Sequence, residues 1–412
     1  MWHKVYVVLV VWFHGFLLWG QYSMPMEELP HEGTWLQWPH NYTYGAGAED
    51  VESSWVEMTS ALSAGERVHI VAYNDFEVLH ISALLEEANV DMAQVDFLVC
   101  PTDDFWVRDN GPMFVEDAQG EWAILNWGFN GWGGDAPFSL DDDVPLIAGN
   151  ALGLPVVDLS AVVLEGGAIE MDGQGTLLAT RSSITGEDRN PGFTEEEIEA
   201  FFSTYLGAEQ IVWLDGQFGG VEDITDQHID GFVKFTGDNT MVTMSNPDLA
   251  YWYVSASDRD ILDGAENAQG IPFTRVNLPL TQDPVHTTWG ENLGFRGTYV
   301  NYYIGNVAVL VPEYGDPMDQ VALDIIQGLY PARTAVGINC QNMSQWGGMV
   351  HCVTQQQPLG ATSPVLEAPE AIPEGEIVRV WDSMGRETTS QSNALLLYLF
   401  SNGEVRKAFH SE

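Results

Sequence analysis

Apolar residues alternate with polar residues in some segments of the chain and recur at helical spacing in others. The alternating segment from Gly33 to His40 meets a proline near its end and predicts a strand. Helical spacing predicts one helix from Val51 to Ala64. A second helix is predicted from Asp75 to Ala88, where Asn74 or Asp75 supplies the N-terminal cap.

Two later helices carry start and stop signals. Thr194–Glu197 is a capping-box sequence, and the helix that it opens is expected to reach Leu206 and to end at Gly207. Asp316–Pro317 opens another helix, which ends before Pro331. The chain therefore mixes helices and strands along its length.

Between these helices one pattern recurs four times. Each copy begins with a polar residue, continues as a short strand, turns at Gly, Asp or Asn, and returns as an apolar strand. The copies cover residues 109–125, 165–180, 230–244 and 301–311. A single hairpin and helix cannot bury its apolar face alone, so copies at similar spacing predict a closed radial array.

The polar residues that start the copies are candidates for one shared pocket. They are Asp109, Glu165, Asp230 and Asn301, and Cys352 follows at a similar interval. In a radial array the equivalent strand ends meet near the axis, so we expect these five residues to converge. The alternative is a set of unrelated hairpins that begin with residues common in turns.

Charge limits the classes of partner. The 412-residue chain has 60 Asp and Glu against 14 Lys and Arg, a formal net charge of −46. Such a chain repels phosphate groups, which argues against nucleic acid and anionic membrane surfaces as partners and favours cationic ligands. The same charge also suits a strongly hydrated surface. Three cysteines are too few for a disulfide framework.

Cys352 lies in the stretch from Gly347 to Pro358, between a glycine pair and three glutamines. From spacing alone its thiol is a nucleophile, a metal ligand or a buried packing residue. Three carboxylates near a thiol oppose thiolate formation, unless the substrate is itself a cation. A guanidinium offers a planar fork of N–H donors that two carboxylates bind in bidentate fashion. The pattern therefore points to guanidine hydrolysis.

Proton transfer requires a histidine, and His228 is the candidate because it lies two positions before Asp230. In a strand both side chains would point to the same face. His351 would alternate away from Cys352 if that stretch were extended, so we interpret it as structural. A zinc site that includes Cys340 and Cys352 is the alternative, although no close Cys pair or His-x-His spacing supports it.

These motifs resemble those of the agmatine deiminase and bacterial peptidylarginine deiminase family, part of the guanidine-modifying superfamily. The resemblance covers roughly residues 24–360 in the family's order. The matching segments are Met24–His40, Asp103–Pro112, Leu164–Gly167, Gly175–Leu178, Arg189–Pro191, Asp223–Asp230, Tyr299–Asn301 and Gly347–Pro358.

The resemblance implies a five-bladed, pseudo-symmetric α/β propeller of the pentein type with a central active-site pocket. By matching position, Cys352 would be the nucleophile and His228 the general acid and base. Asp109 and Asp230 would hold the guanidinium, and Glu165 would contact the histidine or the substrate. Attack at the guanidinium carbon would release ammonia and leave a covalent thiouronium, which water hydrolyses to a ureido product. No metal or organic cofactor is implied.

The substrate is expected to be a small cationic guanidinium compound or an arginine-containing peptide. Further substrate-binding residues are expected at Trp106, Trp132, Asn301 and Arg181. The loop from Trp127 to Gly134 looks like the agmatine deiminase version, and residues 127–150 contain no Arg or Lys to bind a terminal carboxylate. This favours agmatine, with N-carbamoylputrescine as product. Arg181 stands where agmatine deiminases usually have an acidic residue, and it favours peptidylarginine, with citrulline as product.

Two more departures from the family pattern lie near the expected pocket. Gln227 replaces a glycine that is usual before the histidine, and Met349 stands where a third glycine is common. A non-catalytic secreted protein that captures cations or peptides is the alternative of another class, and the intact set of thiol, base and paired carboxylates argues against it. A papain-like cysteine protease is a weaker alternative, because Cys352 follows the histidine and lacks that family's surrounding pattern.

The chain is expected to have four parts. Residues 1–21 are typical of a secretory signal peptide, because Lys4 precedes an apolar run that is short for a transmembrane span. We therefore expect a secreted, cell-surface or periplasmic protein with no membrane insertion after processing. Residues 22–360 are the expected catalytic domain, and 361–376 a Pro- and Glu-rich linker. Residues 377–412 are a short β-rich tail, which resembles a shortened sorting domain of type IX secretion or is a last hairpin on the main domain.

Overall fold

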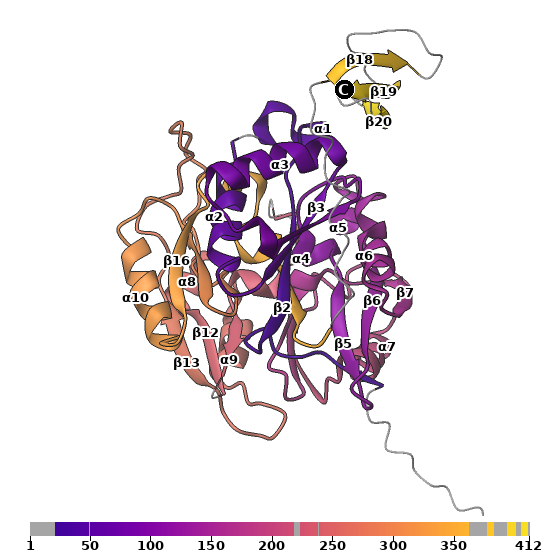
Figure 1. Ribbon diagram of the computed structural model, residues 1–412. Coiled ribbons are helices and arrows are strands. Elements are labelled where there is room, and N and C mark those ends of the chain that lie inside the picture. Colours follow the sequence, from indigo (N-terminus) through magenta and orange to yellow (C-terminus); the bar gives the residue numbers. More distant parts are fainter. Residues whose placement is uncertain are drawn as a thin grey trace, which may run out of the picture.

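The computed structural model describes residues 21–48, 50–217, 223–237, 239–361, 377–382, 394–400 and 405–410. Between residues 22 and 358, the described strands form five separate mixed sheets (Figure 1). Their strand orders are β1-β5-β6-β7, β10-β9-β8, β11-β12-β13, β14-β15-β16 and β17-β2-β3-β4. The fold is therefore α/β with mixed sheets.

Each of the five sheets has one strand that pairs antiparallel on one side and parallel on the other. The antiparallel partner comes from a hairpin in four of the sheets. The parallel partner follows a crossover, which is usually helical. The strands are β1 (Tyr22–Ser23), β2 (His31–Gln37), β3 (Arg67–Ala72), β4 (Val95–Val99), β5 (Met113–Asp117), β6 (Trp122–Gly128), β7 (Val156–Val163), β8 (Ile169–Met171), β9 (Thr176–Thr180), β10 (Gln210–Leu214), β11 (Lys234–Thr236), β12 (Thr240–Met244), β13 (Thr274–Leu278), β14 (Tyr303–Ile304), β15 (Ala308–Glu313), β16 (Thr334–Asn339) and β17 (Gln355–Pro358).

The helices begin and end where local chemistry favours it. The Asn74 side chain caps α3 by accepting from two backbone N–H groups. Thr194 and Glu197 form the predicted capping box of α7, and the helical segment ends at Gly207 in the left-handed region. The α-helices are α1 (Asn41–Tyr44), α2 (Glu52–Leu62), α3 (Asp75–Glu87), α4 (Val107–Asn110), α5 (Gly131–Gly134), α6 (Val144–Leu152), α7 (Glu195–Phe201), α8 (Asn246–Tyr251), α9 (Ala256–Asp263) and α10 (Asp319–Leu329).

Short 3-10 and π segments fill many of the remaining connections. They are η1 (Gly45–Ala48), η2 (Met92–Gln94), η3 (Asp141–Asp143), η4 (Gly166–Ala168), the π segment η5 (Phe202–Leu206), η6 (Ile229–Gly231), η7 (Met343–Trp346) and η8 (His351–Val353). Among the described helices, none has the length and apolar character needed to span a membrane.

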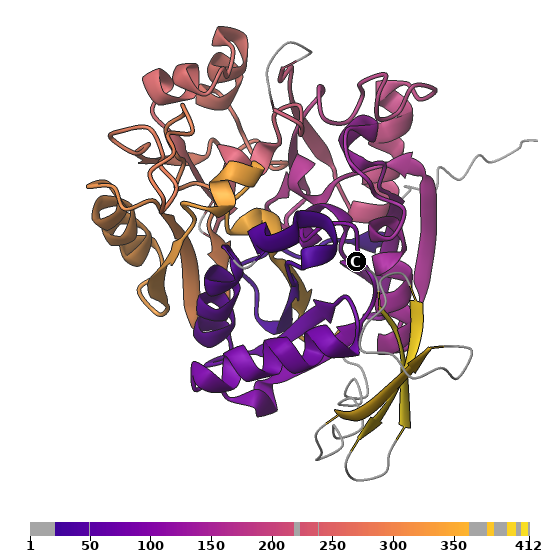
Figure 2. The same cartoon turned by 90° about the horizontal axis from the view of Figure 1, so that it is seen from above.

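The fifth sheet joins two distant parts of the chain. Strand β17 pairs antiparallel with β2, so that Gln355 lies opposite Trp35 and Gln357 opposite Gly33. Seen from above, the chain passes around the molecule in sequence order, and the segment near residue 350 lies toward the middle (Figure 2). The end of the main domain therefore closes on its beginning.

The sequence-based elements are largely confirmed. All four predicted hairpins are present, and so are the strand near residue 33 and the four helices, with shifted ends. The extended conformation expected around His228 is wrong, because Ile229–Gly231 is a 3-10 turn. The stretch at Cys352 is likewise a turn, η8. Cys100 and Cys340 are free and buried, and Cys352 is free and partly exposed.

The parts of the chain outside the main domain are described only in places. Residues 1–20, where the signal peptide is predicted, and 362–376, most of the predicted linker, lie outside the described residues. In the tail, β18 (Ile377–Asp382), β19 (Ala394–Phe400) and β20 (Val405–His410) form an antiparallel sheet of their own. The roles predicted for these segments stay predictions.

Candidate active site

Four of the five predicted pocket residues lie on short turns that lead into a sheet. Asp109 belongs to α4, and Glu165 directly precedes η4. Asp230 belongs to η6 and Cys352 to η8. Each turn is followed within a few residues by a strand that pairs antiparallel in its sheet. The repeated turn-then-strand arrangement places the four side chains at equivalent points of four sheets.

Gly167 marks the point where these groups meet. A Cβ atom placed on Gly167 would lie 2.7 Å from His228 Nδ1, 2.8 Å from Asp109 Oδ1 and 3.0 Å from Asp230 Oδ2. Three polar atoms from two distant segments, α4 and the turn at residues 228–231, therefore surround one backbone position. The convergence predicted from the repeats is present in the structure for these residues.

The Cys352 thiol lies beside Asp230 and Asn301. Its Sγ atom is 3.8 Å from Asp230 Oδ2 and 3.4 Å from Asn301 Nδ2, which donates toward the sulfur. Burial and the carboxylates of Asp230 and Asp109 raise the pKa of Cys352 well above its usual value. The thiol is therefore protonated while the pocket lacks a cation.

His228 lies between two carboxylates. Its Nε2 atom is 2.7 Å from Glu165 Oε2, and its Nδ1 atom is 3.6 Å from Asp109 Oδ1. Burial disfavours the charged ring, but Asp109 and Glu165 outweigh it and raise the pKa of His228 to about 9. Glu165 is in turn held by Arg189, at 2.6 Å from Nε to Oε1. His228 is therefore protonated at neutral pH and can donate a proton.

Asp109 is bound mainly by neutral donors. Trp132 Nε1 donates to Oδ2 at 2.9 Å, and the backbone N–H of Gly167 donates to Oδ1 at 3.0 Å. Burial raises the pKa of Asp109 to about 6, because the nearby His228 only partly offsets it. Trp132 has φ +53, a region that a bulky residue rarely adopts. The strained backbone thus aims the Trp132 indole at Asp109.

Two other predicted substrate-binding residues, Asn301 and Trp106, lie near Cys352. Asn301 is fully buried, and besides Cys352 it contacts the backbone of Asp230 and of His351. Trp106 precedes α4 and packs against Gly348, where a Cβ would lie 2.2 Å from its indole ring. The structure brings both residues next to the thiol segment.

Arg181 has charged partners within its own part of the fold. Its guanidinium binds Glu195 at 2.6 Å and Asp215 at 3.1 Å and lies over the Trp213 ring. These contacts compensate its charge, and its role in substrate binding stays a prediction. The sequence could not show these contacts, because its partners lie 14 and 34 positions along the chain.

Two of the family departures are also located. Gln227 has φ +72, the left-handed region that favours glycine, and its Nε2 donates to the Trp252 carbonyl at 2.9 Å. The side-chain bond holds a backbone conformation that glycine adopts freely. Met349 is buried in the main hydrophobic cluster.

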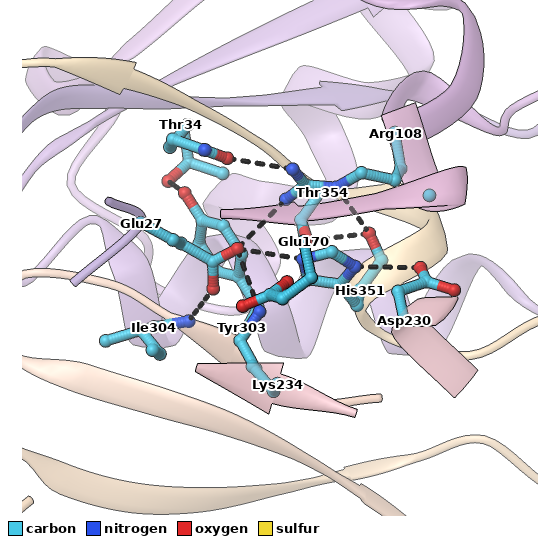
Figure 3. A network of polar contacts seen from close by, with 12 residues as sticks. Glu27, Thr34, Arg108, Glu170, Asp230, Lys234, Tyr303, Ile304, His351 and Thr354 are labelled. Carbon is cyan, nitrogen blue, oxygen red and sulfur yellow. Dashed lines mark hydrogen bonds and ion pairs between the residues drawn. The ribbon is translucent and has the colours of Figure 1, made fainter. Parts of the chain in front are cut away.

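Sequence reasoning missed two residues next to the site, His351 and Glu27. His351 Nδ1 lies 2.8 Å from Asp230 Oδ2, and Glu27 Oε2 lies 2.8 Å from His351 Nε2 (Figure 3). Both residues lie inside segments that carried the family resemblance. Glu27 lies beside a second acidic residue, Glu28, and nothing local distinguished it or linked it to a residue 324 positions away.

Comparisons with known proteins agree with this geometry. The model of the Porphyromonas-type peptidyl-arginine deiminase family matches residues 23–358. The chain belongs to this family. It is 32% identical to the agmatine deiminase of Pseudomonas syringae pv. tomato over 360 residues, which are 82% of this chain and 95% of that protein. It is also 32% identical to the agmatine deiminase of Pseudomonas fluorescens, over 82% of this chain and 95% of that protein.

Solved structures show the same relationship. The agmatine deiminase of Enterococcus faecalis superposes with a TM-score of 0.72 and 28% identity, over 82% of this chain and 96% of that one. Membership of the family makes the protein an amidine-hydrolysing enzyme, acting on C–N bonds that are not peptide bonds. The alternatives of a non-catalytic binding protein and of a papain-like protease are therefore wrong.

Gly167→Ala tests the convergence directly. The added methyl would force apart His228, Asp109 and Asp230, and misplacing such groups by about 1 Å costs about a hundredfold in kcat/KM. Steady-state ammonia release with a guanidinium substrate measures the loss. The matched control is Gly192→Ala, because a Cβ at Gly192 meets no atom within 4 Å. Equal activity of the two variants, both folded by circular dichroism, would contradict the site.

Proposed function

We propose that the protein is a deiminase that converts agmatine to N-carbamoylputrescine and ammonia, with Cys352 as the nucleophile. The observation that carries the proposal is the position of the thiol. Its Sγ lies within 4 Å of Asp230, and that carboxylate and Asp109 face one point together with His228. A guanidinium at this point has two carboxylates for its N–H groups, a sulfur for its carbon and an acid for its leaving nitrogen.

The positive charge of the substrate allows the Cys352 thiolate to form. The carboxylates that suppress the Cys352 thiolate are the groups that bind the guanidinium, so the bound cation offsets their repulsion. The thiol releases its proton to solvent, and the resulting thiolate attacks the guanidinium carbon and forms a C–S bond. His228 then gives its proton to the leaving amino group as the C–N bond breaks, and this nitrogen departs as ammonia. The product of this half-reaction is a thiouronium on Cys352.

Water completes the cycle. His228, now neutral, accepts a proton from water as the oxygen attacks the thiouronium carbon. The C–S bond breaks, the sulfur leaves as thiolate, and the ureido product forms as its oxygen loses a proton, which balances the protonation that restores the Cys352 thiol. Glu165 and Arg189 keep the imidazole oriented throughout, because the His228 ring is buried against Glu165 at 2.7 Å. No metal or organic cofactor takes part in this proposal.

The five mixed sheets are proposed as the blades of a propeller. Their shared pattern of one antiparallel and one parallel partner supports it, as does the passage of the chain around the molecule in sequence order (Figure 2). The axis of such a propeller holds the turns before the antiparallel strands. Asp109, Glu165, Asp230 and Cys352 all lie on such turns.

Agmatine is favoured over peptidylarginine because few Arg or Lys side chains are available to bind a substrate carboxylate. The loop of residues 127–150, which carries Trp132, has no Arg or Lys, and Arg181 is already held by Glu195 and Asp215. A carboxylate or peptide chain at the far end of the substrate thus lacks a cationic partner among these residues. The names of the Pseudomonas relatives agree with agmatine. The family name keeps peptidylarginine as the second candidate, with citrulline as product.

Ammonia release decides between the candidates. The purified protein is offered agmatine, free arginine and a peptide ending in arginine, and kcat/KM is compared. We expect agmatine to give the highest value and Cys352→Ser to lower it by at least about a thousandfold. Preference for the peptide would overturn the choice of agmatine. Silence on all three substrates would overturn the proposed activity itself.

The pH dependence of kcat/KM follows from the two raised pKa values. Asp109 must be ionised to bind the guanidinium, and burial raises its pKa to about 6, so activity is lost as pH falls through this value. His228 must be protonated to donate, and the carboxylates raise its pKa to about 9 against burial, so activity is lost as pH rises through that value. We expect a bell-shaped profile with limbs near pH 6 and pH 9.

The variant Asp226→Asn tests whether Asp109 is the group that titrates in the acid limb of kcat/KM. Burial also raises the pKa of Asp226 to about 6, but this residue pairs with Arg189 and is not among the groups around Gly167. Asp226→Asn should keep the acid limb where it is in the parent protein. Loss of the limb in this variant would assign it to Asp226 and contradict the role of Asp109.

We also propose that the enzyme is exported, as a secreted, cell-surface or periplasmic protein. Support comes from the sequence of residues 1–21 and from the separate three-stranded sheet of the tail. If the tail directs sorting, truncation after Gly375 should leave enzyme activity intact and abolish export, followed by activity in cell fractions. Normal export of the truncated chain would show that the tail has no sorting role.

A further inference from the structure

A second group of buried charged residues lies next to the site, and Glu27 is at its centre. This residue belongs to the segment before β2 and is 8% exposed. Its carboxylate lies 2.8 Å from His351 Nε2, 3.0 Å from Lys234 Nζ and 3.4 Å from Arg108 Nη2 (Figure 3). It also accepts from the backbone N–H of Ile304 at 2.9 Å. Burial alone would raise the pKa of Glu27, but these cations lower it well below the usual value. Glu27 is therefore an anion.

His351 links this anion to the pocket. Its ring is 2% exposed, with Glu27 on one nitrogen and Asp230 on the other, each at 2.8 Å. Ionised carboxylates only accept hydrogen bonds, so both ring nitrogens have to donate when Glu27 and Asp230 are ionised. The backbone of His351 is held as well, because its N–H donates to Asn301 Oδ1 at 2.9 Å. Contacts on both ring nitrogens therefore keep the ring directed at Asp230.

The bond from His351 falls on the Asp230 oxygen that faces the pocket. Oδ2 is the atom 2.8 Å from His351 Nδ1, and it is also the atom 3.8 Å from Cys352 Sγ. Burial opposes ionisation of Asp230, but the bond from His351 overcomes it and lowers the pKa below the usual value. Asp109 has no comparable partner, and burial raises its pKa. The two carboxylates around the substrate position are thus held in different ways.

We infer that Glu27 and His351 are positioning residues, which hold the Asp230 carboxylate in its guanidinium-binding orientation and keep it charged. The inference rests on the proposed function for its consequence, a guanidinium bound by Asp230. The charged groups that interact with His351 come from several segments: Glu27, Glu170 and Asp230 face its ring, and Arg108 contacts its backbone carbonyl. Lys234 lies against Glu27. Among these, Glu27 and Asp230 accept from its ring nitrogens.

His351→Gln and Glu27→Gln test the inference by kinetics. Both substitutions preserve side-chain length and polarity but remove the ring charge or its anchor. We expect the KM for agmatine to rise about tenfold or more. Asp109 sets the acid limb of kcat/KM in the parent protein, and we expect this limb to become steeper and to move to higher pH, because Asp230 then has to ionise in the same pH range. A purely structural role would lower activity by the same factor at every pH.

Glu170→Gln is the matched control. Glu170 is buried near Glu27, Lys234 and His351. It accepts from the backbone N–H of Phe235 at 2.7 Å, but not from His351. This variant should keep the acid limb of the parent protein. Unchanged limbs in His351→Gln and Glu27→Gln would overturn the inference, and so would a shift of equal size in Glu170→Gln.

A carboxyl titration separates this inference from the proposed function. Carbon-13 NMR of aspartate side chains, with the Asp230 signal assigned by its loss in Asp230→Asn, gives the ionisation of Asp230 without any turnover. The pKa of Asp230 should be higher in His351→Gln than in the parent protein, and higher in Glu27→Gln as well. If the parent protein releases no ammonia, the proposed function fails, and the titration alone decides the inference. If the parent is active but the titration is unmoved, only the inference fails.

Discussion

The structure depends on burying several carboxylates together at the centre of the molecule. Glu27, Asp109, Glu165 and Asp230 are each at most 8% exposed, and isolated charges of this kind are strongly disfavoured in a protein interior. Three of them have a cationic partner within 3 Å: Lys234, Arg189 and His351 respectively. Asp109 is the exception, because its nearest cation, His228, lies at 3.6 Å. In the proposed function, a bound guanidinium would complete the charge compensation at Asp109.

In the proposed mechanism, the same buried carboxylates also explain how the Cys352 thiol is unreactive without substrate and reactive with it. In the empty pocket the carboxylates raise the pKa of Cys352, so the thiolate forms only when a cation is present. In the proposed mechanism activation is therefore tied to binding, because the carboxylates that would bind the guanidinium also control the thiolate that would attack it. The pKa of Asp230 is lowered and that of Asp109 is raised, so Asp230 would be charged before the cation arrives and Asp109 would ionise more easily afterwards. The proposed pocket would thus be selective before any bond is made.

Sequence reasoning found the features that are local. The hairpins were visible because a polar start, a Gly, Asp or Asn turn and an apolar return lie within a few residues, and Thr194 and Glu197 signal a helix start by themselves. The site residues followed because the repeat and the family motifs mark Asp109, Glu165, Asp230 and Cys352. The orientation of Arg181 and the Glu27–His351–Asp230 chain could not be predicted, because they depend on contacts between distant segments. The conformation at His228 was missed because Gln227 adopts a positive φ that its residue type does not signal.

The position of Cys352 in the chain couples the chemistry to the completion of the fold. The thiol lies on η8, immediately before β17, and β17 pairs with β2 near the start of the main domain. Arg108 strengthens the same junction, because its Nη1 donates to Gln356 at 2.9 Å and its Nε to the His351 carbonyl at 3.4 Å. Closing so long a stretch of chain costs entropy, which the β17–β2 pairing and the Arg108 contacts help to offset. The position of Cys352, the proposed nucleophile, is therefore tied to the contact between the first and last parts of the main domain.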